Sequence, residues 1–163
     1  GVAGALQKDL DLGDTVISRD VVQYDVDAST FGHEPGEIPN LGIKAFNASR
    51  DLAEKALKVH KCLFPDKKAI LGRVLTGDQF ISSHEKAKLL VETFDGACVE
   101  MEGAAIGHVC YLNSIPFLVI RSISDKADGE AVKDYKAFAD EVANKSYKLL
   151  SEMIKDDIFS ELK

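Results

Sequence analysis

Short apolar segments alternate along this chain with longer segments of helical periodicity, and this alternation constrains the fold most strongly. Four segments have the length and composition of strands: 14–24, 69–75, 97–101 and 117–120. The last is a continuous apolar run, which is typical of a parallel strand buried on both faces. Strands that alternate with helices predict an α/β fold with a largely parallel sheet. The length of 163 residues fits one domain.

Helices are predicted where apolar residues recur on one side of a segment. The predicted helices are 47–63, a segment after the capping-box pattern 82–85, 103–112 and 134–154. The first is expected to bury Leu52, Ala56, Val59 and Leu63, and the last to bury Phe138, Val142, Leu149, Leu150 and Met153. Residues 1–4 and 31–42 are predicted to be loops, and 156–163 a short tail or helix extension.

Charge and cysteine content argue against several classes of protein. The net charge is −7 and no basic stripe is present, which disfavours binding to a nucleic-acid backbone. No apolar run approaches the length of a membrane span. Three cysteines without metal-ligand spacing predict free thiols in a reducing compartment, and therefore a cytoplasmic protein. The histidines of the predicted helices have no partner ligands nearby in sequence, so no metal site is expected.

Polar residues gather where three of the predicted strands end. They are found in 76–81, 100–102 and 121–125. Ligands of open α/β sheets bind beyond the carboxyl ends of the strands. We therefore expect these three segments to meet at one binding site.

Asp125 is the sharpest catalytic candidate in these segments. A carboxyl group beyond a buried strand is partly desolvated, which raises its pKa and suits a general acid. The alternative is a helix N-cap or a surface aspartate. Arg121 emerges from an apolar strand and needs a charged partner, either in a structural ion pair or in catalysis.

Glu100 and Glu102 lie two residues apart and face the same side in extended geometry, where they could accept hydrogen bonds from sugar hydroxyls. One of them could instead favour the positive end of a helix dipole. Phe80 could stack on a flat heterocycle whose edge is read by the Ile81 backbone, or both could be ordinary core. Phe31 and His33, in the long loop, could cover a ligand, even in a neighbouring subunit, or could tether that loop.

Six segments together resemble the methylthioadenosine/S-adenosylhomocysteine nucleosidases, within the purine nucleoside phosphorylase/uridine phosphorylase superfamily. In chain order they are Gly1–Leu6, Gly13–Asp14, Phe31–Pro39, Gly77–Ile81, Val99–Ala105 and Arg121–Asp128. Each is weak alone, whereas the ordered set covers nearly the whole chain. The resemblance implies a three-layer α/β/α sandwich with a mixed, largely parallel central sheet, usually as a homodimer. It also implies hydrolysis of the N-glycosidic bond of 5′-methylthioadenosine and S-adenosylhomocysteine, with no cofactor or metal.

The resemblance assigns a role to each matching residue. Asp125, oriented by Ser124, would protonate adenine N7, and Arg121 would order the carboxylates and the attacking water. Positions expected to contact the substrate are Gly4, Val2, Phe80, Ile81, Glu100, Met101 and Glu102. Positions expected to reach into the partner's 5′-substituent pocket are Ala28, Phe31, His33 and Pro39. Val2 departs from the pattern, because many relatives have serine there.

The resemblance also implies a further stretch before Gly1, with the glutamate that activates water, so residues 1–163 would form one domain without its N-terminal part. A nucleoside phosphorylase remains an alternative, as does a hydrolase of futalosine or AMP. A non-catalytic binding or storage protein on the same fold is a third. The amino-acid sequences of segments 31–39 and 121–128 favour the nucleosidase.

Overall fold

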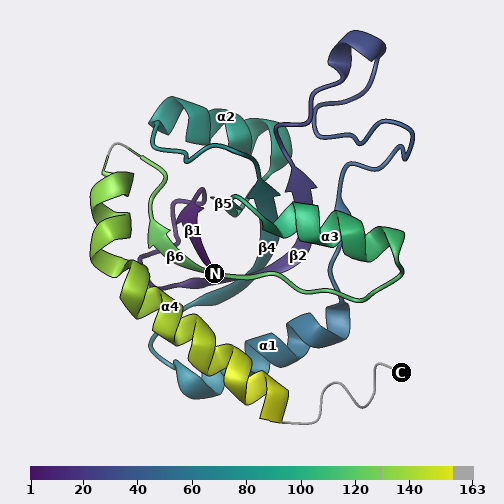
Figure 1. The fold of residues 1–163 in the computed structure, drawn as a ribbon. Helices are drawn as coiled ribbons and strands as arrows, with labels where there is room; N and C mark the ends of the chain where they lie inside the picture. Colours follow the sequence, from purple (N-terminus) through teal and green to yellow (C-terminus); the bar gives the residue numbers. More distant parts are fainter. Residues whose placement is uncertain (129, 156–163) are drawn as a thin grey trace.

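One mixed sheet organises the computed structural model, which describes residues 1–128 and 130–155. The elements are β1 (Val2–Ala5), β2 (Thr15–Gln23), the 3-10 helix η1 (Ser29–Phe31), β3 (Phe46–Asn47), α1 (Arg50–Leu63), β4 (Ala69–Thr76), α2 (His84–Phe94), β5 (Cys98–Glu100), α3 (Gly103–Leu112), β6 (Ile120–Asp125) and α4 (Ala131–Lys155). The strand order is β3-β2-β4-β5-β1-β6, and β2 also pairs with β6. Five strands therefore close into a ring, with β3 attached to β2 (Figure 1).

The sheet is mixed, as predicted, but antiparallel pairs are as numerous as parallel ones. The pairs β2–β4, β4–β5 and β1–β6 are parallel, whereas β1–β5, β2–β3 and β2–β6 are antiparallel. A shift of register between Ser18 and Asp20 marks a bulge in β2. Because a bulge bends a strand, β2 can pair with β6 at Thr15–Ile17 and with β3 at Asp20–Val21.

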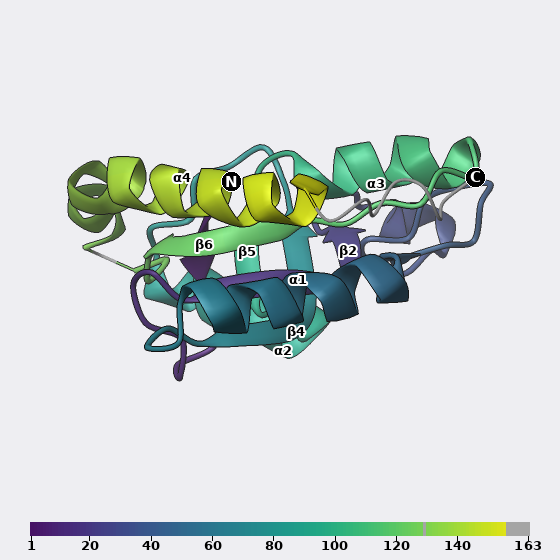
Figure 2. The ribbon, with the colours of Figure 1, turned by 90° about the horizontal axis from the view of Figure 1, so that it is seen from below.

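Helices surround this ring on several sides (Figure 1). Helices α1 and α4 lie side by side, as Figure 2 also shows, and they share a buried cluster with Ile17 of β2. Helix α3 contacts β2, β3 and β4. Helix α2 buries Ala87, Leu90 and Phe94 in a cluster with Leu75 of β4. In the part of the chain that is described, no helix is both long and apolar enough to cross a membrane.

Two strand predictions were wrong. Residues 1–4 are not a loop, because Val2–Ala5 pair with strands on both edges. Their small side chains lack an apolar signature, yet Ala3 and Ala5 are buried. The run 117–120 is not a doubly buried strand: β6 begins only at Ile120, and of this run only Val119 is buried. The polar residues 121–125 therefore lie within β6 instead of following it.

The helices were placed correctly, but several boundaries and faces differ from the prediction. Helix α1 begins after the N-cap Ser49, since Asn47 is in β3, and it buries Ala53, Ala56 and His60 while Leu63 is exposed. Ser83, and not Ser82, caps α2. Helix α4 starts three residues earlier than predicted and leaves Leu150 exposed. The predicted tail 156–163 lies outside the described residues.

Candidate active site

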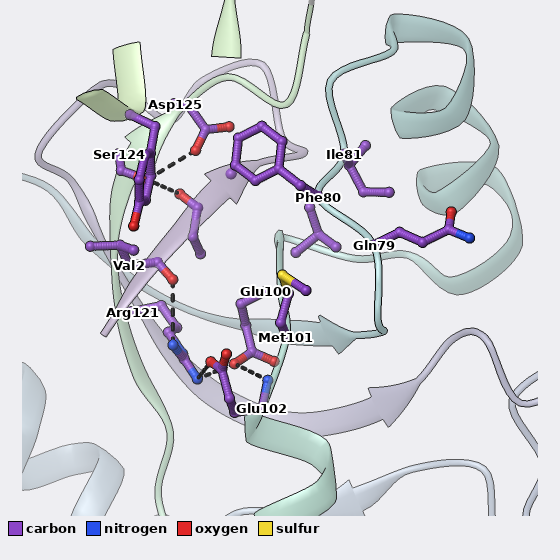
Figure 3. Close-up of a pocket in the computed structure, with 14 residues that line it drawn as sticks. Val2, Gln79, Phe80, Ile81, Glu100, Met101, Glu102, Arg121, Ser124 and Asp125 are labelled. Atoms are coloured by element: carbon purple, nitrogen blue, oxygen red, sulfur yellow. Dashed lines mark hydrogen bonds and ion pairs between the residues drawn. The ribbon is translucent and has the colours of Figure 1, made fainter. Parts of the chain in front are cut away.

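A pocket of about 400 Å³ lies where β1, β5 and β6 meet the segment that follows β4 (Figure 3). The three segments that were predicted to meet do line this pocket. Because β6 is parallel to β1 and β1 is antiparallel to β5, the polar residues of β6 line the pocket along the strand and not at a shared carboxyl edge. The lining residues are Val2, Ala3, Gly4, Gln79, Phe80, Ile81, Val99, Glu100, Met101, Glu102, Arg121, Ser124, Asp125 and Tyr135.

Asp125 and Ser124 are brought together by a bulge in β6. The β1–β6 register passes from Ala3 opposite Ile123 to Gly4 opposite Asp125, which leaves Ser124 as the extra residue. Consecutive side chains normally point to opposite faces of a strand, and a bulge re-aims them. Here the Ser124 hydroxyl donates to Asp125 Oδ2 over 2.9 Å, and both residues are buried.

The Asp125 carboxyl is held from two further directions. The Ala127 backbone N–H donates to Asp125 Oδ1 at 2.9 Å. A Cβ atom added at Gly4 would lie 2.7 Å from Asp125 Oδ1 and 3.1 Å from Ala127 Cβ. Glycine is therefore needed at position 4, because any side chain would displace the carboxyl group or the loop behind it.

Glu100 is a buried carboxylate at the beginning of α3. Its oxygens accept backbone N–H groups of Gly103 at 2.8 and 3.0 Å and of Glu102 at 3.2 Å, and they also accept the Thr76 hydroxyl. A helix N-terminus favours negative charge, so α3 stabilises this carboxylate. Burial also raises the pKa of the neighbouring Cys98 thiol, which keeps it protonated.

Arg121 joins the acidic residues of the pocket. Its Nη2 forms ion pairs with Glu100 and, at 3.1 Å, with Glu102 Oε2, while Nη1 donates to the Val2 carbonyl at 3.4 Å. The Glu100 side chain is 1% exposed and that of Glu102 is 62% exposed. Glu102 thus has an open carboxylate at the pocket, whereas the Glu100 carboxylate is enclosed by its hydrogen bonds and by Arg121.

An apolar wall faces these polar groups. Phe80 and Met101 are half-exposed, and Ile81 is buried behind Phe80. The Tyr135 ring of α4 meets the Phe80 ring edge-on, with centroids 6.0 Å apart. The pocket therefore combines an aromatic surface with a buried carboxyl group and an exposed carboxylate.

The sequence predicted most of this lining but not all of it. All three predicted catalytic residues, together with Gly4, Val2, Phe80, Ile81, Glu100, Met101 and Glu102, line the pocket. The four residues predicted for the partner's pocket do not line this one: Ala28, Phe31, His33 and Pro39. They lie in the connecting segment 25–45, which projects from the ring of strands (Figure 1). Phe31 is 84% exposed there, and His33 pairs with Glu37 at 2.7 Å. Ala3, Gln79 and Val99 were not named, although each is next to a predicted residue in the chain. Tyr135 was missed because it reaches the site through the packing of α4 against β6. Among the described residues no group of metal-binding side chains is present.

Comparison with known proteins identifies the family to which this chain belongs. The sequence model of the phosphorylase superfamily matches residues 1–155. The chain is 39% identical over 155 residues to the 5′-methylthioadenosine/S-adenosylhomocysteine nucleosidase of Staphylococcus aureus strain JH9. The matched region covers 94% of this chain and 67% of the relative. The chain therefore belongs to the phosphorylase superfamily, and within it to the family of these nucleosidases. It spans about two thirds of the length of the relatives that it matches.

Solved structures give the same result. A Helicobacter pylori nucleosidase mutant with 5′-methylthioadenosine in its active site matches with a TM-score of 0.90 and 36% identity, over 96% of this chain and 66% of that one. The futalosine hydrolase of Helicobacter pylori matches with a TM-score of 0.89 and 39% identity, over 96% and 66%. A Colwellia psychrerythraea nucleosidase in complex with adenine matches with a TM-score of 0.88 and 36% identity, over 95% and 64%.

Proposed function

We propose that the protein hydrolyses the N-glycosidic bond of 5′-methylthioadenosine and S-adenosylhomocysteine and releases adenine. The observation that carries this proposal is the arrangement of one pocket: a buried Asp125 beside Ser124, an aromatic wall at Phe80, and an exposed carboxylate at Glu102. The pocket therefore offers an aromatic surface for a purine, a proton donor for that base and a carboxylate that can bind sugar hydroxyls.

In the proposed reaction Asp125 gives a proton to adenine N7 as the bond between C1′ and N9 breaks. The bonding electrons leave with the base, which departs as neutral adenine. Water adds to C1′ and gives one proton to the water-activating glutamate that we propose for the N-terminal stretch. Positive charge develops on the ribose in the transition state, and nearby carboxylates stabilise it. Ser124 orients Asp125, because its hydroxyl already donates to Oδ2.

The same geometry supports a set of proposed substrate contacts. Glu102 accepts the ribose hydroxyls, Met101 packs against the sugar near Gly4 and Val2, and Phe80 stacks on the adenine. The Ile81 backbone reads the edge of the base. Arg121, which pairs with both glutamates, orders these carboxylates and the attacking water.

The larger assembly is also proposed. Two chains would form a homodimer in which Ala28, Phe31, His33 and Pro39 reach the partner's 5′-substituent pocket, which fits the strong exposure of the Phe31 ring. The helices around the sheet would form the outer layers of an α/β/α sandwich. We also propose that a further N-terminal stretch completes this single domain and supplies the water-activating glutamate. The relatives are longer than this chain, which is compatible with this proposal.

Adenine release by the full-length protein, with and without phosphate, tests the proposal. We expect release from 5′-methylthioadenosine in the absence of phosphate. Strict dependence on phosphate would show phosphorolysis, and adenine binding without turnover would show a non-catalytic protein. Futalosine is the second candidate substrate, because a futalosine hydrolase is as similar in structure as the nucleosidases. The ratio of kcat/KM for the two substrates decides between them.

A further inference from the structure

The segment Gly77–Ile81 is held from behind by the end of β2. It begins directly after β4 and carries Phe80 and Ile81 into the pocket. The backbone N–H of Asp78 donates to Asp25 Oδ2 at 2.8 Å. Asp25 lies just beyond β2 and does not line the pocket itself. One exposed carboxylate thus fixes the backbone two residues before the aromatic wall.

Tyr24 supports the same segment by packing. A side chain at Gly77 would overlap the Tyr24 ring and lie 2.8 Å from its hydroxyl oxygen, so this ring rests directly on the Gly77 backbone. Tyr24 is 8% exposed, in one buried cluster with Ile81 and Phe94. Its hydroxyl has no hydrogen-bond partner among the described residues, so the ring supports the segment through packing alone.

We propose that Asp25 is a positioning residue that sets the place of Phe80 and Ile81 for purine binding. This inference rests on the proposed function of the pocket. The hydrogen bond to Asp78 and the contact of Tyr24 with Gly77 act on consecutive residues of one short segment. Asp125 lies on β6 and has separate supports from Ser124 and Ala127. Loss of the Asp25 contact therefore weakens purine binding and leaves proton donation in place.

Three variants of the full-length protein test this inference. Asp25→Ala removes the acceptor for the Asp78 N–H, whereas Asp25→Asn keeps an oxygen that can accept it. Asp27→Ala is the matched control, because Asp27 Oδ1 accepts the Ser29 N–H at 2.9 Å on the same loop without contacting Gly77–Ile81. We expect Asp25→Ala to raise KM and the Kd of adenine about fivefold with kcat nearly unchanged. Asp25→Asn should restore most of the affinity, and Asp27→Ala should leave the Kd of adenine at the wild-type value.

Two results would overturn the inference: an unchanged adenine Kd in Asp25→Ala, or an equal change in Asp27→Ala. A fall in kcat alone would also contradict it, because that would place the effect on the proton donor. The proposed function is judged separately by the wild type. If the wild type releases no adenine, the function fails whatever the Asp25 variants do. If it releases adenine and Asp25→Ala behaves normally, only the positioning role fails.

Discussion

Glu100 in the pocket and His60 on the inner face of α1 are both buried, with 5% and 1% of the whole residue exposed, but their surroundings differ in how they support a charge. Glu100 accepts two backbone N–H groups and a hydroxyl and pairs with Arg121. His60 Nε2 has no hydrogen-bond partner among the described residues, and burial lowers the pKa of the ring to about 4. The pocket surrounds the acidic group of Glu100 with partners, whereas burial keeps the His60 ring neutral.

This difference separates chemistry from packing. A buried charge persists only where hydrogen bonds and an opposite charge offset its desolvation. The pocket provides such partners through the start of α3 and through Arg121. The layer between α1 and α4 provides mainly apolar contacts, including Ile17, Ala56 and Leu149. Variants in the two regions should therefore fail in different ways.

Asp125→Asn should give the largest effect. The amide keeps the shape of the side chain but has no carboxyl proton to donate, so kcat should fall about a thousandfold while adenine still binds. Steady-state adenine release and equilibrium adenine binding measure the two quantities. Asp128→Asn is the control, because Asp128 lies three residues further along, after β6, and its Oδ1 accepts the Glu130 backbone N–H at 3.0 Å. Rates near those of the wild type in Asp125→Asn would refute the assignment.

Glu100→Gln should mainly reduce stability. The neutral amide leaves the partly buried Arg121 guanidinium with the exposed Glu102 as its acidic partner in the pocket, so we expect the free energy of unfolding to fall by about 3 kcal/mol. Urea denaturation measures this change. Glu92→Gln breaks an exposed pair with Lys88 and should cost under about 0.5 kcal/mol. Equal losses in the two variants would mean that the pocket carboxylate has no special support.

The sequence predicted the pocket better than the sheet that builds it. The converging segments were identified because charged and aromatic residues follow apolar runs, and this pattern is local. The strand Val2–Ala5 was missed because its small residues are required by close neighbours, such as Asp125 against Gly4, which only the folded chain brings together. The bulge at Ser124 was not foreseen for the same reason, since it depends on register with β1.

The helix faces show a second limit of sequence reasoning. Periodicity predicted the large residue Leu63 on the buried face of α1, whereas small Ala53 and a neutral His60 occupy it. Helix α1 packs on β2 and β4, and which of its residues face them depends on the orientation of the helix, which a pattern of hydrophobicity alone does not fix. Tyr135 likewise reached the pocket only through the packing of α4 against β6.

His60 should give the next largest effect, seen in stability against pH. Its folded pKa of about 4 lies below the ordinary value of 6.5, so the unfolded chain binds more protons between these values. The folded protein is most stable above pH 6.5, where His60 is neutral in both states, and it loses stability as the pH falls toward 4. Between pH 7 and pH 5 the wild type should lose about 2 kcal/mol of unfolding free energy through His60. This part of the loss should be absent from His60→Leu. Thermal and urea unfolding at both pH values test this, with the exposed His84→Leu as the control that should keep the wild-type slope.

Glu102→Gln should give the smallest effect and the most selective one. Its side chain is largely exposed, so its pair with Arg121 adds little to stability, and the free energy of unfolding should change by less than about 0.5 kcal/mol. The amide is a weaker acceptor than the carboxylate for sugar hydroxyls, so KM should rise about tenfold. Glu85→Gln is the matched control, because Glu85 also lies at the beginning of a helix but outside the pocket. A large loss of stability in Glu102→Gln with an unchanged KM would place this residue with the structural carboxylates and erase its contrast with Glu100.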